Sequence, residues 1–144
     1  LNQIPTLCEE ALRYKISIPI GYYEYVSMDD RMLEAWRSKT SHLIIGNTLK
    51  NINDVFYGAN NGEGLEEILK YEGYNELINR ADEYFSEADK LYAELTTPLI
   101  GNLESNEGTL TKLRLSFKKI RTLIMADIAP SLGFIITFSD SDGD

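Results

Sequence analysis

The stretch that decides the fold is TLTKLRLSFKKIRTLIMADIAPSLGFIITFSDSDGD, residues 109–144. Its apolar residues recur every three or four positions, which places them on one face of an α-helix. These residues are Leu110, Leu113, Phe117, Ile120, Ile124 and Ile128. Thr109 is suited to cap the start of this helix, and Pro130 and Gly133 predict its end. A short extended segment and a carboxylate-rich terminus follow.

Three segments upstream of this helix show the same spacing of apolar residues. They are residues 4–16, 27–57 and 75–95. Ser27 is expected to cap the second of them, which either restarts near Thr40 or runs straight through. Each of the four helices has one apolar face and therefore needs neighbours on that side only.

Four amphipathic helices with connections of modest length predict an all-α fold. We expect a four-helix bundle of the up-and-down type with a short extended C-terminal tail. Residues 65–69 are expected to form a helical turn at most, and residues 96–108 a loop. Because 144 residues is the size of one domain and no linker divides them, 1–144 is predicted to be a single helical-bundle domain.

The charge of the chain excludes some classes of partner. The formal net charge is −9 and the pI about 4.6, which argues against nucleic acid and against an anionic membrane surface. No run approaches the roughly 18 apolar residues of a membrane span. The chain begins at Leu1 without a signal-like segment, so we expect a removed signal or a longer protein.

The single cysteine and the single histidine offer little chemistry by themselves. Cys8 cannot form an internal disulfide and is predicted to be a small buried core residue. His42 has no carboxylate at helical spacing within one turn, so the chain lacks the H-E-x-x-H type of metal site. His42 is therefore predicted to be a surface or packing residue, and no catalytic residue is assigned.

The acidic terminus is the candidate metal-binding segment. Asp140, Asp142 and Asp144 alternate with Ser141 and Gly143, like the front of a calcium loop. The closing Glu of an EF-hand is missing because the sequence stops there. Two interpretations stay open: oxygen ligands for a hard cation, or a solvated tail.

Five basic residues gather on the last predicted helix. They are Lys112, Arg114, Lys118, Lys119 and Arg121. They either complement the acidic face of the helix at 75–95 or dock an acidic partner. Among the tyrosines, Tyr22, Tyr23 and Tyr25 are expected in a loop, whereas Tyr84 and Tyr92 have core spacing.

The C-terminal sequence resembles the imelysin family. The residues that carry the resemblance are L-G-F at 132–134 and F-S-D-S-D-G-D at 138–144. A second stretch supports it: N-I-N-D-V-F-Y-G at 51–58, G-E-G-L at 62–65 and I-L at 68–69. The likeness covers residues 43–144, with Ser139 at a position where the family usually has Asn.

The resemblance implies a bacterial envelope protein, periplasmic or surface-exposed, and in many members lipid-anchored. Imelysin-like proteins are built from two helical bundles and are linked to iron uptake, and a peptidase activity has been attributed to the family. Their hallmark G-x-H-x-x-E motif is absent here, because Thr40 and Ile45 flank His42 at its positions. The chain therefore resembles the C-terminal half, and membrane contact would come only through an anchor outside this chain.

The resemblance also implies a site. Asp140, Asp142 and Asp144 would bind iron or another divalent cation, or orient its ligands, at the contact with an N-terminal half. Gly133 and Gly143 would supply backbone geometry. That N-terminal half would belong to the same protein or to a separate chain. Two alternatives are a metallopeptidase whose metal site lies in the missing half, and a purely structural or partner-binding module. This chain alone is expected to have no independent activity.

Overall fold

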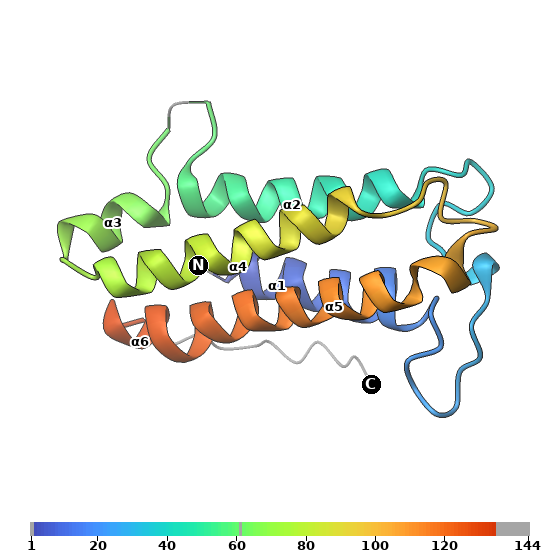
Figure 1. Cartoon of the computed structure of the whole chain (residues 1–144). Helices are drawn as coiled ribbons and strands as arrows, with labels where there is room; N and C mark the ends of the chain where they lie inside the picture. The colour runs from blue at the N-terminus through green and yellow to red at the C-terminus, as the bar shows by residue number, and fades with distance from the viewer. Residues whose placement is uncertain (1, 61, 135–144) are drawn as a thin grey trace, which may run out of the picture.

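The computed structural model describes residues 2–60 and 62–134, and within them the regular structure is entirely helical (Figure 1). The all-α prediction is confirmed. The α-helices are α1 (Gln3–Glu10), α2 (Ser41–Tyr57), α3 (Leu65–Tyr71), α4 (Asn75–Ala93), α5 (Leu103–Thr122) and α6 (Ala129–Ser131). Two π-helical segments, η1 (Ala11–Ser17) and η3 (Leu123–Ile128), and one 3₁₀ turn, η2 (Asp30–Met32), complete the set.

Several of these elements join into longer helices. α1 continues directly into η1, and α5 continues through η3 into α6. α5 contacts α1 and α4, and α2 also contacts α1 and α4, so the four long helical segments surround a common centre (Figure 1). α3 is a helix of seven residues where only a turn was predicted, so the predicted number of helices was one too low.

The last long helix begins at Leu103, earlier than the predicted start at Thr109. Asn106 explains the difference. Its buried side chain accepts a hydrogen bond from the Thr96 N–H (2.9 Å) and donates to the Thr96 carbonyl (2.9 Å) and the Asn102 carbonyl (2.8 Å). These bonds fasten the preceding loop to the helix, which offsets the low helix propensity of Gly108 in the first turns.

No α-helix begins at Ser27, contrary to the prediction. Asp29 instead caps the 3₁₀ turn η2 by accepting a hydrogen bond from the Arg31 N–H at 2.9 Å. The chain then passes through turns, with Lys39 in the left-handed region at φ 62°, and the helix starts at Ser41. The sequence had left this restart open. In the structure Leu33 is buried before the turns, and the Ser41 hydroxyl accepts a hydrogen bond from the Ala35 N–H at 3.3 Å where the helix begins.

The helix that ends the described chain passes through Pro130 and stops at Gly133. Pro130 was predicted to end it, but the widened π-helical turns of η3 precede the ring and relieve its clash with the backbone. Gly133 has φ 74°, its N–H donates to the Pro130 carbonyl (3.0 Å), and the Phe134 N–H donates to Ala129 (2.8 Å). This pair of bonds is the Schellman motif, which favours glycine at the left-handed position.

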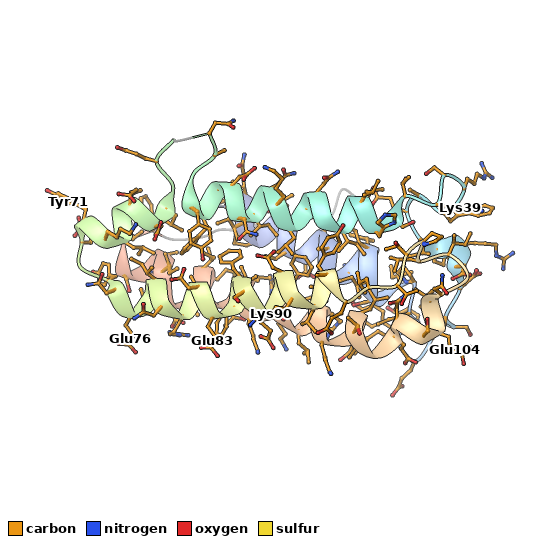
Figure 2. The ribbon with its side chains drawn as sticks, turned by 45° about the horizontal axis from the view of Figure 1, so that its top comes forward. Lys39, Tyr71, Glu76, Glu83, Lys90 and Glu104 are labelled. Carbon is orange, nitrogen blue, oxygen red and sulfur yellow. The ribbon has the colours of Figure 1, made fainter. Side chains whose placement is uncertain are left out.

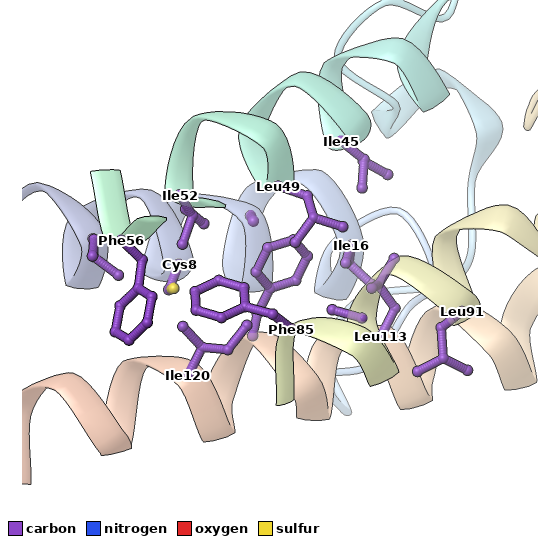
Figure 3. Packing of buried hydrophobic residues seen from close by; sticks show 14 of the residues in the cluster. Cys8, Ile16, Ile45, Leu49, Ile52, Phe56, Phe85, Leu91, Leu113 and Ile120 are labelled. Atoms are coloured by element: carbon purple, nitrogen blue, oxygen red, sulfur yellow. The ribbon is translucent and has the colours of Figure 1, made fainter. Parts of the chain in front are cut away.

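One continuous core lies between the helices (Figure 3). Ile16, Leu49, Phe85 and Ile120 approach one another there from η1, α2, α4 and α5. Cys8 is fully buried among them, as predicted, and burial raises the pKa of its thiol to about 12. The opposite face of α4 is charged, and Glu76, Glu83 and Lys90 project away from the bundle (Figure 2). Within the described residues, no helix combines the length and the apolar character needed to cross a membrane.

Two leucines on α5 test where the core lies. Leu113 is fully buried and Leu115 is 45% exposed. We expect Leu113→Ala to lower the free energy of unfolding by about 2–5 kcal/mol, because it leaves a cavity. Leu115→Ala removes the same atoms from the surface and is expected to cost less than about 1 kcal/mol. Urea denaturation of both variants measures this, and equal losses would contradict the packing of α5.

Candidate functional site

A groove opens at the point where the chain leaves the last helix. Its volume is about 790 Å³. We call it the exit groove; it is lined by Asn2, Gln3, Ile4, Val55, Glu63, Gly64, Leu65, Ile68 and Phe134. A neighbouring groove of about 570 Å³ lies between α1 and α2 and shares Asn2, Gln3 and Val55 with it. Apolar side chains (Ile4, Val55, Leu65, Ile68 and Phe134) and polar ones (Asn2, Gln3 and Glu63) both line the exit groove.

Adjacent apolar residues on α2 and α3 build the wall of the exit groove. In Val55-Phe56 and Ile68-Leu69, the second residue is fully buried in the core. The first residue of each pair faces the groove instead. A helix directs neighbouring side chains about 100° apart, so the two members of each pair face in different directions. These consecutive apolar residues were the signal in the sequence that could have revealed the groove.

The loop before α3 forms another part of the groove wall because Gly64 lies directly against the end of α2. A Cβ atom at Gly64 would come within 2.3 Å of the Gly58 nitrogen and 2.4 Å of the Phe56 carbonyl oxygen. Only glycine allows this approach, since real Cβ atoms do not come so close to backbone. The loop therefore turns Leu65 into the bundle, where it is 7% exposed.

The last helix and α3 meet at the same end of the molecule. The Tyr74 hydroxyl, in the turn between α3 and α4, donates a hydrogen bond to the Ser131 carbonyl at 2.9 Å. Large apolar side chains remain exposed at this end: Tyr71 is 88%, Ile68 50% and Phe134 53% exposed. Tyr71 points away from the bundle beyond α3 (Figure 2). Exposed apolar groups at one end of a small domain are typical of an interaction surface.

A half-buried tyrosine joins α2 to α4 near this end. The Tyr57 hydroxyl donates a hydrogen bond to the Asp82 carboxylate at 2.7 Å. Burial, and then the bond to the Asp82 carboxylate, raise the pKa of Tyr57 well above its ordinary value. The phenol therefore stays protonated in the folded protein at any physiological pH and serves as a donor.

The candidate metal ligands Asp140, Asp142 and Asp144 lie outside the described residues, as does Gly143. Gly133 is described and forms the helix stop given above. Between residues 2 and 134, excluding 61, no group of three or more His, Cys, Asp or Glu side chains is placed to hold a metal ion. His42 lies partly buried on the first turn of α2, and its Nδ1 has no hydrogen-bond partner there.

The basic cluster of α5 is divided among several neighbours. Lys119 pairs with Glu87 of α4 at 2.7 Å, as intramolecular complementation predicts, and Arg121 pairs with Glu9 of α1 at 3.3 Å. Both pairs are partly exposed and contribute roughly 0–1 kcal/mol each. The charges therefore help to position α4 and α1 against α5 without deciding the fold.

Arg114 differs from the rest of the cluster because it is 9% exposed. Its Nε donates a hydrogen bond to the Ser17 hydroxyl at 2.8 Å, and the Ser17 hydroxyl donates to the Leu12 carbonyl at 2.5 Å. The guanidinium carbon lies 3.7 Å from the centre of the Tyr22 ring. The Tyr22 ring and the Ser17 hydroxyl together replace water around the Arg114 cation. These contacts join α5 to η1 and to the loop that contains Tyr22.

A comparison of the chain with protein-family models, with curated proteins and with solved structures gave no match. The resemblance to the imelysin family therefore stays a prediction.

The bond between Tyr57 and Asp82 predicts a dependence on alkaline pH. Because the pKa of Tyr57 is raised on folding, the unfolded chain binds fewer protons above about pH 10 and stability falls as pH rises. Tyr57→Phe removes this contribution, so its free energy of unfolding is expected to fall less steeply above pH 10. Urea titrations between pH 8 and pH 11 measure the slopes. Tyr71→Phe, at an exposed tyrosine, is expected to keep the original slope.

The contacts of Arg114 predict that lysine cannot replace it. Arg114→Lys loses the planar contact with Tyr22 and the geometry of the bond to Ser17, so we expect a loss of about 1–3 kcal/mol in the free energy of unfolding. Lys118→Arg on the exposed side of the same helix is expected to change it by less than about 0.5 kcal/mol. Denaturant titration compares the two variants. An Arg114→Lys variant with an unchanged free energy of unfolding would show that the guanidinium contacts contribute nothing to stability.

Proposed function

We propose that this domain is the C-terminal half of an imelysin-like protein of the bacterial envelope, and that it takes part in iron uptake by binding a metal cation next to a second helical half. In this proposal the four long helical segments form an up-and-down bundle, and α3 closes the end that faces the second half. Asp140, Asp142 and Asp144 supply oxygen ligands, or orient ligands from the other half.

One observation carries the proposal: the described chain reaches Phe134, ahead of its carboxylates in the sequence, at the end where apolar side chains are exposed. Gly133 stops the helix there, and Phe134 and Ile68 share the wall of the exit groove. A second helical half that covered Ile68 and Tyr71 would lie beside Phe134, which precedes Asp140 by six residues in the sequence.

Two other functions remain distinct from this one. A metallopeptidase would need a general base and an open metal position, and both would have to come from the second half. A structural module would use the acidic tail only to hydrogen-bond helix N-termini at the contact between halves. We favour metal binding because alternating carboxylates are the ligand type that hard cations prefer.

The proposal predicts that two aspartates control metal affinity. We expect Asp142→Asn together with Asp144→Asn to weaken binding of Fe²⁺ or another divalent cation at least about tenfold, because the variant loses two negative ligands. Isothermal titration with the reunited halves measures this. Glu76→Gln together with Glu83→Gln removes two charges from the outer face of α4 and serves as the matched control.

The outcomes separate the three functions. Loss of affinity in the tail variant alone supports metal binding. Unchanged affinity with weaker association of the halves would support the structural function and contradict the proposal. Hydrolysis of a denatured protein substrate by the reunited halves, lost on chelation of the metal, would favour the peptidase.

A further inference from the structure

α4 and α5 lie side by side and run in opposite directions (Figure 1). Two ion pairs fix their relative direction. Arg80 of α4 pairs at 2.8 Å with Asp127 of η3, the continuation of α5, and Glu87 of α4 pairs with Lys119 of α5 at 2.7 Å. The lower number on α4 thus pairs with the higher number on the other helix. We call the outward surface of these two helices the α4/α5 face.

The two halves of the α4/α5 face carry exposed charges of opposite sign at equal spacing. These charges are Glu76, Asp82 and Glu83 on α4, and Lys112, Lys118 and Lys119 on α5. Each base follows one acid by 36 positions (76 and 112, 82 and 118, 83 and 119). Because a helix rises by about 1.5 Å per residue, both sets have the same spacing along their axes. No Asp or Glu occurs between residues 108 and 126, so this part of α5 is uniformly basic.

Most of these charges are not used inside the molecule. Lys119 pairs with Glu87, and Asp82 accepts the hydrogen bond from Tyr57. Four others have no ion pair with any residue of 2–60 or 62–134: Glu76, Glu83, Lys112 and Lys118. Leu115 lies three residues from each of the two unpaired lysines and is 45% exposed. The face therefore offers unpaired charge of both signs around an exposed apolar side chain.

The equal spacing makes the α4/α5 face complementary to itself. Because α4 and α5 are antiparallel, a two-fold axis perpendicular to the face lays α5 of one copy along α4 of a second copy, with both helices running in the same direction. If Lys112 lies opposite Glu76 of the second copy, the other two pairs come into register as well, and symmetry forms each pair twice. Lys90, which projects from the outer side of α4 (Figure 2), then lies opposite the uncharged Ala126 and meets no like charge.

The charge pattern also selects the partner. A basic partner would be attracted by Glu76 and Glu83 but repelled by the lysines on α5 beside them, and an acidic partner would meet the reverse. A second copy presents both signs in the order that the face requires. Each copy has a formal net charge of −9, so the attraction comes from this local match and not from the charge of the whole chain.

From these observations we infer that the protein binds a second copy of itself through the α4/α5 face and forms a symmetric dimer. The lysines of α5 pair with the carboxylates of α4 in the other copy, and the contact covers Leu115. The dimer dissociates as the salt concentration rises, because salt screens exposed ion pairs. This inference goes beyond the proposed function, since it uses neither the acidic terminus nor a second helical half.

An exchange of charge between Glu76 and Lys112 tests the dimer. Within one chain these residues lie at opposite ends of the paired helices, roughly 25 Å apart along the axis, so one substitution can compensate the other only across two copies. Sedimentation velocity of the full chain measures the mass, which is 16.4 kDa for one copy, at up to about 0.5 mM protein in buffer with a chelator. Glu10→Lys and Arg37→Glu make the same charge changes at exposed positions outside α4 and α5 and are the matched controls.

We expect the native chain to approach twice the mass of one copy at low salt and to return to the mass of one copy at about 0.5 M salt. Glu76→Lys alone or Lys112→Glu alone is expected to raise the Kd of the dimer about tenfold, because each change makes two attractive pairs repulsive. The double variant Glu76→Lys/Lys112→Glu is expected to restore the native Kd. Both control variants are expected to keep it.

Several results would overturn the inference. A native chain that keeps the mass of one copy at about 0.5 mM and low salt does not form the dimer. A double variant that associates no better than the single variants, or controls that lose association equally, would show that these two residues do not meet. A mass that grows beyond two copies with protein concentration would indicate an open head-to-tail contact instead of a closed symmetric one. Far-UV circular dichroism of each variant checks that the helices are intact.

Discussion

Burial of α5 on two sides is the constraint on which the rest of this structure depends. α5 contacts α4 on one side and α1 with η1 on the other. Phe117 and Ile120 are removed from water between them. Side chains in a packed core fit together in few arrangements. A helix that packs against two neighbours at once therefore restricts the angles between its own axis and both of theirs. α2 then closes the remaining side by contacting α1 and α4.

Polar contacts refine this arrangement at places where apolar packing alone would leave freedom. Asn106 fastens a loop to the first turns of α5, and Arg114 joins the same helix to Ser17 and Tyr22. Each group is buried and each has partners, as burial requires. Such contacts favour one register of α5 against η1, because a shift by one turn would leave a buried cation without its acceptor.

The packing also bears on why apolar side chains are exposed at one end. The core uses one face of each helix, and α3 is too short to cover the ends of the helices beside it. Val55 packs against the core with one side and lines the exit groove, and Ile68 is half exposed. Both residues thus contribute apolar area to the exit groove, at the end where the described chain reaches Phe134.

The sequence by itself determined that this chain is helical and which faces are apolar, because a spacing of three and four is a local property of residues such as Leu110, Leu113 and Phe117. It also located the glycine stop at Gly133. Only the tertiary structure decided that α5 starts at Leu103 and that the helix passes through Pro130. Asn106 acts on a residue ten positions away and so leaves no local pattern. The groove also depended on the tertiary structure: the apolar pairs at 55–56 and 68–69 are local, but their meeting with residues from both ends of the chain is not.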